Sequence, residues 1–211
     1  MNVLELFAGS RSIGKAAESL GHKVFSVDWQ SFDNIDLSID IEFLTIKDIP
    51  FIPDIIWASP DCTTYSIAAI SHHRNGIIPK SDYAKKCDAV NENMHKLIKE
   101  YLLVNPKLKY YIENPRGMMG KMPFIKHCET STIWYCTYGD NRAKPTNIFS
   151  NNIYSLFNQN GWKPKKECFN GNKNCHHESA PRGSKTGTQG LKDSYNRSKI
   201  PHELCLEILK S

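Results

Sequence analysis

Reactive side chains in this sequence follow apolar runs in several short segments. Gly9, Cys62 and Glu113 each come shortly after such a run, and Arg142 and Lys144 alternate further along the chain. A thiol in a loop after a buried strand could act as a nucleophile, although an inert buried cysteine is the more common alternative. A desolvated carboxyl could hold a proton for hydrogen bonding, or simply cap a turn. The two cations suit contacts with phosphates or bases, but solvated surface charges follow the same pattern.

The segment around Gly9 has the residue types of a ligand-binding turn. Residues 6–14 combine the end of an apolar run, a glycine and the start of a helical pattern, so the backbone could approach a ligand closely. Asp28 ends the next apolar run and could bind a ribose diol, and Trp29 could stack on an adenine. One interpretation is a nucleoside cofactor, and the other is a plain strand, turn and helix with a surface acid. The segment has neither the G-x-G-x-x-G pattern nor the lysine of a phosphate loop.

The elements that would position these residues alternate along the first half of the chain. Apolar runs predict strands at residues 3–7, 23–27, 54–58, 109–112 and 132–136, and helical spacing predicts helices at 12–20, 83–104 and 201–210. Strands joined by helices form mostly parallel sheets that are covered on both faces. Ligands of such sheets bind outside the carboxyl ends of the strands, where Gly9, Asp28, Ser59, Pro60 and Glu113 fall. We therefore expect one α/β domain with a single polar crevice.

The composition is that of a folded domain. The chain has 211 residues, of which 40% are hydrophobic and 23% are charged, and no apolar stretch is long enough to span a membrane. The first residues predict a buried strand rather than a signal peptide, and the seven scattered cysteines favour reduced thiols over disulfides. The net charge of +5 permits a nucleic-acid partner without demonstrating one.

The composition changes after residue 150. Residues 151–198 are rich in Asn, Lys, Gly and Ser, have few apolar runs, and contain Cys168, Cys175 and His176. A small lobe that is poor in apolar residues would benefit from a metal staple, and Cys136 lies just before it. These four side chains are therefore candidate ligands of a structural zinc ion. Because their spacing is not that of common zinc motifs, free thiols beside surface histidines remain the alternative.

Taken in order, the segments resemble the motifs of the DNA cytosine-5 methyltransferases. The resemblance covers nearly the whole chain, and the compact form resembles the short members of that family encoded by bacteriophages. The matching positions are Phe7-Ala8-Gly9, Asp28, Asp40-Ile41, Pro60-Asp61-Cys62, Glu113-Asn114, Arg142-Ala143-Lys144 and Arg197-Ser198-Lys199-Ile200-Pro201. The chain departs from the family pattern at Asp61, Thr63, Lys144 and Ser198, and it lacks the glutamine that precedes the two cations.

The resemblance implies a Rossmann-like methyltransferase sheet with a small irregular target-recognition lobe. The core would comprise residues 1–150, the lobe residues 151–196, and a C-terminal segment, residues 197–211, would pack back on the core. The resemblance also implies S-adenosylmethionine as the methyl donor. The residues that would bind it are Phe7, Ala8, Gly9, Ser10, Ser12, Ile13, Asp28, Trp29, Asp40, Ile41, Ser59, Pro60 and Ser198.

The resemblance further implies a reaction. Cys62 would add to carbon 6 of a cytosine flipped out of duplex DNA, and Glu113 would bond the N3 and amine of that base. Arg142 and Lys144 would hold the base oxygen, the thiol loop or the phosphate. The expected enzyme is a monomer that acts on double-stranded DNA, does not bind membranes, and is located in the cytoplasm of a bacterial cell or a phage-infected host. The alternatives are a tRNA substrate, an amino-methyltransferase acting on adenine N6 or cytosine N4, and an inactive DNA-binding homologue.

Overall fold

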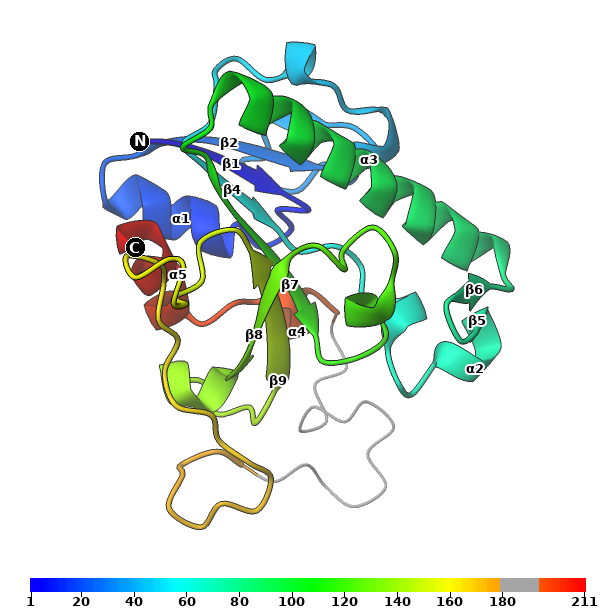
Figure 1. Ribbon diagram of the computed structural model, residues 1–211, viewed down its shortest axis with the longest axis vertical. Helices are drawn as coiled ribbons and strands as arrows, with labels where there is room; N and C mark the ends of the chain where they lie inside the picture. Colours follow the sequence, from blue (N-terminus) through cyan, green and yellow to red (C-terminus); the bar gives the residue numbers. More distant parts are fainter. Residues whose placement is uncertain (179–193) are drawn as a thin grey trace.

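Seven strands form a single sheet in the computed structural model, which describes residues 1–178 and 194–211 (Figure 1). The strands lie in the order β3, β2, β1, β4, β7, β9, β8. Their bounds are β1 Asn2–Leu6, β2 Lys23–Asp28, β3 Leu37–Ser38, β4 Ile55–Ala58, β7 Lys109–Pro115, β8 Glu129–Trp134 and β9 Pro145–Ser150. A separate two-stranded ribbon consists of β5 Arg74–Asn75 and β6 Ile78–Pro79.

The sheet has a parallel part and an antiparallel edge. The five strands from β3 to β7 run parallel, whereas β9 runs antiparallel to both β7 and β8. The strand expected at residues 132–136 is β8, but it starts at Glu129 and ends at Trp134, because Tyr135–Tyr138 form a 3-10 turn. Antiparallel strands can be joined by a short connection, so β8 and β9 need no helical crossover. The expected mostly parallel sheet is confirmed, with this antiparallel edge as an addition.

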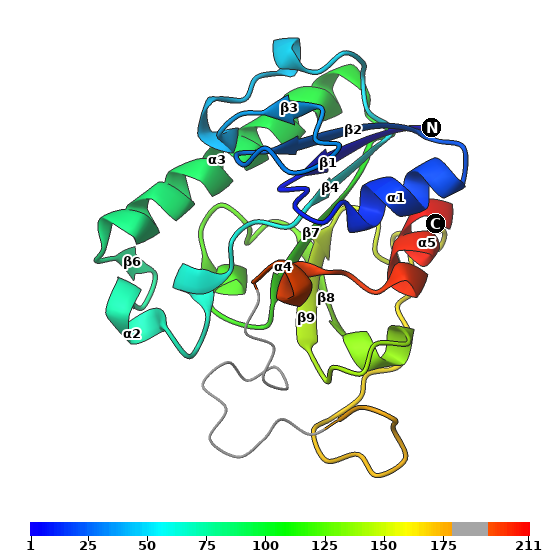
Figure 2. The ribbon, with the colours of Figure 1, turned by 180° about the vertical axis from the view of Figure 1, so that it is seen from behind.

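Helices cover both faces of the sheet (Figures 1 and 2). Their bounds are α1 Ser12–Ser19, α2 Ile70–His73, α3 Asp82–Val104, α4 Ser194–Ser198 and α5 His202–Lys210, and the 3-10 helices are η1 Ile41–Phe43, η2 Ile46–Asp48, η3 Thr63–Tyr65, η4 Met119–Lys121 and η5 Tyr135–Tyr138. α3 packs on one face, and α1 and α5 lie side by side on the other. Leu204 and Ile208 of α5 are fully buried against Ile13 of α1. The final helix therefore packs back on the sheet, as its apolar pattern predicted.

The long helix α3 has clear start and stop signals. The Ser81 hydroxyl accepts the backbone N–H of Ala84 at 3.1 Å and so caps the N-terminus. Met94, Leu97 and Tyr101 recur at helical intervals and are buried on the sheet. The helix ends before Asn105, which Pro106 follows. The N-terminal part of this same face, with Tyr83, Cys87 and Asn91, lines the site described below.

Part of the irregular segment after β9 packs on the core. Trp162 is 2% exposed and stands edge-on to Tyr111 of β7, and its indole N–H donates to Glu207 of α5 at 2.8 Å. Residues 179–193 of the expected target-recognition lobe lie outside the described residues. Within residues 1–178 and 194–211, no helix has the length and apolar character needed to cross a membrane.

Candidate active site

The turn after β1 is tied to the end of β2 by an acid. Gly9 has a φ of +45°, a conformation that glycine adopts without strain. Its N–H donates to Asp28 Oδ2 at 3.0 Å, and the N–H of Gln30 donates to Asp28 Oδ1 at 2.9 Å. Burial raises the pKa of Asp28, and the backbone hydrogen bonds oppose that rise. Asp28 thus orders two turns at the carboxyl ends of neighbouring strands.

A cavity of about 760 Å³ lies at the carboxyl ends of β1, β2 and β4. Its size is within the range of small-molecule sites, roughly 300–1,000 Å³. Of the residues expected to bind a cofactor, those that line it are Phe7, Ala8, Gly9, Ser10, Ser12, Asp28, Trp29, Asp40, Ile41, Ser59, Pro60 and Ser198. Segments far apart in the sequence therefore meet in one cavity.

Ile13 is the exception among these residues, and its expected role is corrected. Its side chain is fully buried in the core between α1 and α5, away from the cavity. Only its backbone makes a polar contact, because its N–H donates to Glu5 Oε1 at 3.0 Å. Glu5, which the sequence analysis missed, lines the cavity from β1. Burial raises the pKa of Glu5 to about 7, although hydrogen bonds from the helix N-terminus and Ser26 lower it.

The far wall of the cavity comes from α3, which the sequence analysis also missed. Tyr83, Lys86 and Asn91 line the cavity from this helix. Lys86 Nζ pairs with Asp40 at 2.7 Å, and this bond lowers the pKa of Asp40 although burial works against it. Apolar periodicity had identified the helix, but its first two turns carried no motif that would have indicated a site.

Cys62, Glu113 and Lys144 form a second group beside the cavity. Cys62 lies between β4 and η3, and Glu113 lies in β7, the strand next to β4. Lys144 Nζ is 3.5 Å from Glu113 Oε1, which also accepts the hydroxyl of Tyr135 at 2.8 Å. Burial raises the pKa of the Cys62 thiol, the charge of Lys144 opposes this, and the charge of Glu113 adds to it. The thiol, the carboxyl and the cation are thus close enough to act on one another.

The loop that carries Cys62 is fixed from both sides. Asn114 donates to the carbonyl of Pro60 at 3.0 Å, which joins the loop to the end of β7. On the other side the buried Arg74 donates to the backbone carbonyl of Thr64 at 2.9 Å. Arg74 also pairs with Asp88 of α3 at 2.6 Å and lies over the ring of Tyr65. A preorganised loop is what a positioned nucleophile requires.

Comparison with known proteins shows which of them resemble this chain in sequence. No family model matches the chain. A frog virus 3 protein described as a DNA (cytosine-5)-methyltransferase is 28% identical over 144 residues, which cover 66% of this chain and 65% of that protein. The chain thus matches just under two thirds of that relative's length. The similarity confirms the resemblance that the motifs indicated.

Two solved structures have the same arrangement of strands and helices. The methyltransferase EhMeth of Entamoeba histolytica superposes with a TM-score of 0.56 at 17% identity, over 80% of this chain and 57% of that one. A protein described as a DNA modification methyltransferase, encoded within an E. coli prophage, superposes with a TM-score of 0.53 at 15% identity, over 80% and 52%. The chain therefore shares the fold of these two methyltransferases over most of its length.

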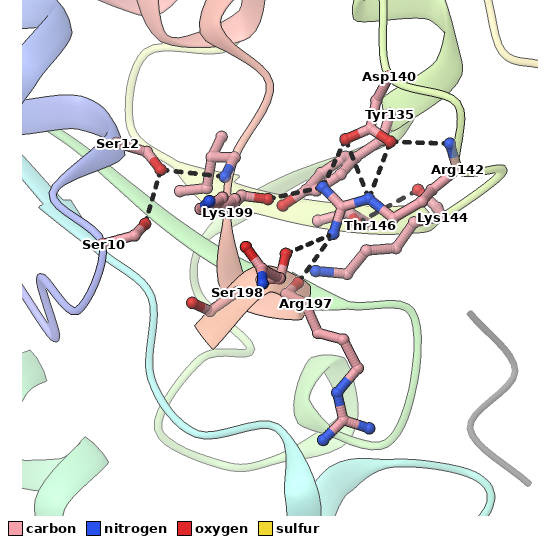
Figure 3. Close-up of polar contacts among 12 residues, drawn as sticks. Ser10, Ser12, Tyr135, Asp140, Arg142, Lys144, Thr146, Arg197, Ser198 and Lys199 are labelled. Carbon is pink, nitrogen blue, oxygen red and sulfur yellow. Dashed lines mark hydrogen bonds and ion pairs between the residues drawn. The ribbon is translucent and has the colours of Figure 1, made fainter. Parts of the chain in front are cut away.

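Within this methyltransferase fold, Arg142 has a different environment from the one expected. Figure 3 shows its guanidinium between Asp140 and the chain segment before α5. Its Nε donates to Asp140 Oδ1 at 2.8 Å, and its terminal nitrogens donate to the carbonyls of Arg197 at 3.0 Å and Lys199 at 2.8 Å. The side chain is therefore engaged with protein groups, and its expected contact with a base, the thiol loop or a phosphate stays a prediction. Of the two expected cations, Lys144 contacts Glu113 and acts on Cys62 through its charge, whereas Arg142 holds the C-terminal segment.

The methyltransferase fold also brings together a group of cysteines and a histidine. The ligand atoms of Cys136, Cys168, Cys175 and His177 all lie within 4.8 Å of one another. The fourth member expected from the sequence was His176, and this is corrected to His177. His176 instead directs its Nε2 to the carbonyl oxygen of Asp140 at 3.1 Å. All seven cysteines of the chain are free of disulfides in this structure.

Proposed function

We propose that this chain transfers a methyl group from S-adenosylmethionine to carbon 5 of a cytosine in double-stranded DNA, with Cys62 as the covalent nucleophile. The single observation that carries the proposal is the group formed by Cys62, Glu113 and Lys144 at the ends of adjacent strands β4 and β7. The similarity to the frog virus protein supports the same reaction.

Cys62 would start the reaction. Carbon 5 of cytosine is a poor nucleophile, but addition of a thiolate to carbon 6 moves electron density onto carbon 5. Because burial raises the pKa of Cys62, the thiol is protonated at neutral pH and must lose its proton as the carbon–sulfur bond forms. The positive charge of Lys144 favours the thiolate. Loss of the proton at carbon 5 and elimination of Cys62 would later restore the ring and the free thiol.

Glu113 would hold the base during this addition. Its side chain is 5% exposed, and Tyr135 and Lys144 both contact Oε1. A carboxyl that is fixed in this way can hydrogen-bond the N3 and the exocyclic amine of a cytosine and stabilise the charge that develops on the ring. The two partners keep the carboxyl oriented before the base enters, so little reorganisation is needed at the moment of reaction.

The residues around the cavity fit S-adenosylmethionine. Trp29 and Phe32 offer aromatic surface for an adenine, the Gly9 turn allows close backbone approach, and Asp28 and Asp40 offer acceptors for hydroxyl and amine groups. When bound, this cofactor supplies an electrophilic methyl group on a sulfonium. The cavity also includes Ser59, Pro60 and Asp61, which directly precede Cys62, so the cofactor and the nucleophile would share one loop.

A nucleic acid is the proposed partner. A cytosine inside a duplex exposes neither face to a thiol, so the base must be flipped out at a cost of a few kcal/mol. Contacts between cations and phosphates can offset that cost, and the net charge of +5 favours them.

Covalent trapping tests the proposal. The full chain is incubated with S-adenosylmethionine and duplex DNA that contains 5-fluorocytosine, which cannot lose a proton at carbon 5. We expect a covalent protein–DNA adduct with the wild type and with Cys128→Ser, a control thiol remote from the cavity, and none with Cys62→Ser. An adduct that persists in Cys62→Ser would overturn the assignment of the nucleophile.

Two further arms separate the alternative functions. Replacing the duplex by tRNA that contains 5-fluorocytosine tests an RNA substrate, and faster trapping there would replace DNA as the proposed partner. Mass analysis of unmodified DNA after reaction distinguishes 5-methylcytosine from N6-methyladenine or N4-methylcytosine. DNA binding with no methylated product would make the chain an inactive homologue.

A further inference from the structure

Four side chains of types that can bind metals converge beside the end of β8. Cys136 belongs to η5, and Cys168, Cys175 and His177 belong to the irregular segment after β9. Their ligand atoms lie within 4.8 Å of one another, with Cys136 and Cys168 buried and the other two half-buried. None of the cysteines is in a disulfide. Such a gathering of soft donors is typical of a metal site and has no role in methyl transfer.

The donor set matches one metal in particular. Three thiolates and one imidazole form a common tetrahedral ligand set of structural zinc, with Zn–S of about 2.3 Å and Zn–N of about 2.0–2.1 Å. These lengths give a sulfur-to-nitrogen edge of about 3.6 Å. The distance from Cys168 Sγ to His177 Nδ1 is 3.7 Å. The Cys168–His177 pair therefore already has nearly the spacing that a zinc ion would impose, and the other ligand atoms lie within 4.8 Å.

The segment that provides three of the ligands has little else to hold it in place. Residues 168–178 contribute only Cys168 and Cys175, among the described residues, to a small hydrophobic cluster with Trp134, Cys136 and Ala143. Phe169, the one large apolar residue next to these ligands, is 61% exposed. A small segment without an adequate core is the kind that requires a metal or disulfide.

This segment in turn contacts residues 140–142, here called the arm, which include Arg142. His176 lies 3.1 Å from the carbonyl of Asp140, and the N–H of Glu178 donates to the carbonyl of Asn141 at 3.0 Å. Glu178 also forms a β-bridge with Arg142. A fixed 168–178 segment would thus hold the Asp140–Arg142 arm in the position from which Arg142 reaches residues 196–199.

We propose that Cys136, Cys168, Cys175 and His177 bind one structural zinc ion, which fixes residues 168–178 against the arm formed by Asp140, Asn141 and Arg142. The proposal goes beyond the methyl transfer proposed above and does not depend on it. It also gives the neighbouring histidines different roles, since His177 is a ligand and His176 contacts only the arm.

Metal analysis of the full chain tests this site. The protein is produced without added metal, carries no histidine tag, and is assayed for zinc by elemental mass spectrometry. We expect about one zinc per chain in the wild type and in His176→Ala, the matched control. In competition with a chromogenic chelator, the zinc affinity of His177→Ala and of Cys175→Ser should be at least about tenfold lower than that of the wild type. Even changes to residues that only contact a ligand lower metal affinity by that factor, so the loss of a ligand should lower it by no less. Circular dichroism establishes that each variant is folded.

Cobalt substitution keeps the proposal testable if the ligand variants fail to fold. The wild-type chain, freed of metal and loaded with Co²⁺ alone, should develop the thiolate-to-cobalt charge-transfer band and the tetrahedral visible bands of a three-sulfur site. Less than about a tenth of an equivalent of zinc in folded wild type, together with a cobalt spectrum that lacks thiolate bands, would overturn the site. Equal zinc loss from His176→Ala and His177→Ala would overturn the assignment of the fourth ligand.

Discussion

Lys144 connects the two groups on which the proposed chemistry depends. Its ammonium lies 3.5 Å from Glu113, and its charge acts on the thiol of Cys62. The thiol experiences two opposing influences, because burial and Glu113 raise its pKa whereas Lys144 lowers it. If the cation is removed, burial and Glu113 remain, and both raise the pKa of Cys62. The pKa of Cys62 should therefore rise.

Replacing Lys144 by methionine should raise the pKa of Cys62 further. A lost opposite charge at this range corresponds to roughly one pKa unit or more. The measurement is the pH dependence of iodoacetamide alkylation at Cys62, followed by peptide mass analysis without DNA. Lys144→Arg, which keeps the charge, should leave the midpoint near that of the wild type. An unchanged midpoint in Lys144→Met would show that the cation does not act on the thiol.

Glu5 predicts a pH dependence of stability. Burial raises its pKa from the ordinary 4.5 of a glutamate to about 7 in the folded chain, so folding disfavours its ionised form. The carboxyl therefore stabilises the fold fully below about pH 4.5, and this contribution is lost as the pH rises through 7. The difference in unfolding free energy between wild type and Glu5→Gln should fall by about 3 kcal/mol over that range. Urea unfolding at several pH values measures it, and a constant difference would contradict the burial argument.

At the scale of elements, the loop after β4 depends on a buried ion pair between the β5–β6 ribbon and α3. The side chain of Arg74 is fully buried and that of Asp88 is 15% exposed. Arg74 also binds the carbonyl and the hydroxyl of Thr64, at 2.9 and 3.1 Å. Gly117 lies against the same loop, since a Cβ there would be 2.5 Å from the carbonyl oxygen of Tyr65. The loop that carries Cys62 is thus positioned by packing on both sides.

Arg74→Met should destabilise the chain and slow trapping. It leaves Asp88 without its cation and the Thr64 carbonyl without its donor, and breaking such a pair costs about 3 kcal/mol or more. Lys85→Met removes a pair with Asp82 whose side chains are 60% and 97% exposed, and it should change stability by less than about 0.5 kcal/mol. Urea unfolding and the trapping rate at saturating cofactor test both. Equal effects of the two variants would contradict the buried role of Arg74.

At the scale of the whole molecule, Arg142 joins the antiparallel edge of the sheet to the C-terminal segment. That segment contributes Ser198 and Ile200 to the cavity, and the N–H of Ile200 donates to Ser12 at 3.2 Å. One wall of the cavity therefore depends on a contact between residues more than fifty positions apart.

Arg142→Lys should weaken cofactor binding even without DNA. Lysine keeps the charge but lacks the planar fork that reaches two carbonyls and Asp140 together. We expect the Kd for S-adenosylmethionine to rise about tenfold, which equals about 1.4 kcal/mol. Isothermal titration in the absence of DNA measures it. An unchanged Kd with slower methyl transfer would assign Arg142 to the nucleic acid, as the sequence motif had suggested.

Local sequence patterns predicted most of the elements and their contribution to the site. Apolar alternation and helical spacing are short-range properties, so β1, β2, β4, β7, α1, α3 and α5 were located within a few residues. The rule that ligands bind at the carboxyl ends of parallel strands then indicated that Gly9, Asp28, Cys62 and Glu113 would share one edge. Each of these residues lies within four positions of the carboxyl end of a strand, so its place at the edge followed from the position of that strand.

Tertiary structure decided the contacts that no local pattern encodes. Neighbouring histidines are equivalent in sequence, and only the path of residues 168–178 turns His177 toward the thiols and His176 toward Asp140. Arg142 and Lys144 stand two positions apart and look equivalent in sequence. In the fold Arg142 meets the C-terminal segment at Lys199, whereas Lys144 meets Glu113 of β7. The sequence determined which residues lie at the edge of the sheet, and long-range packing determined which partner each one faces.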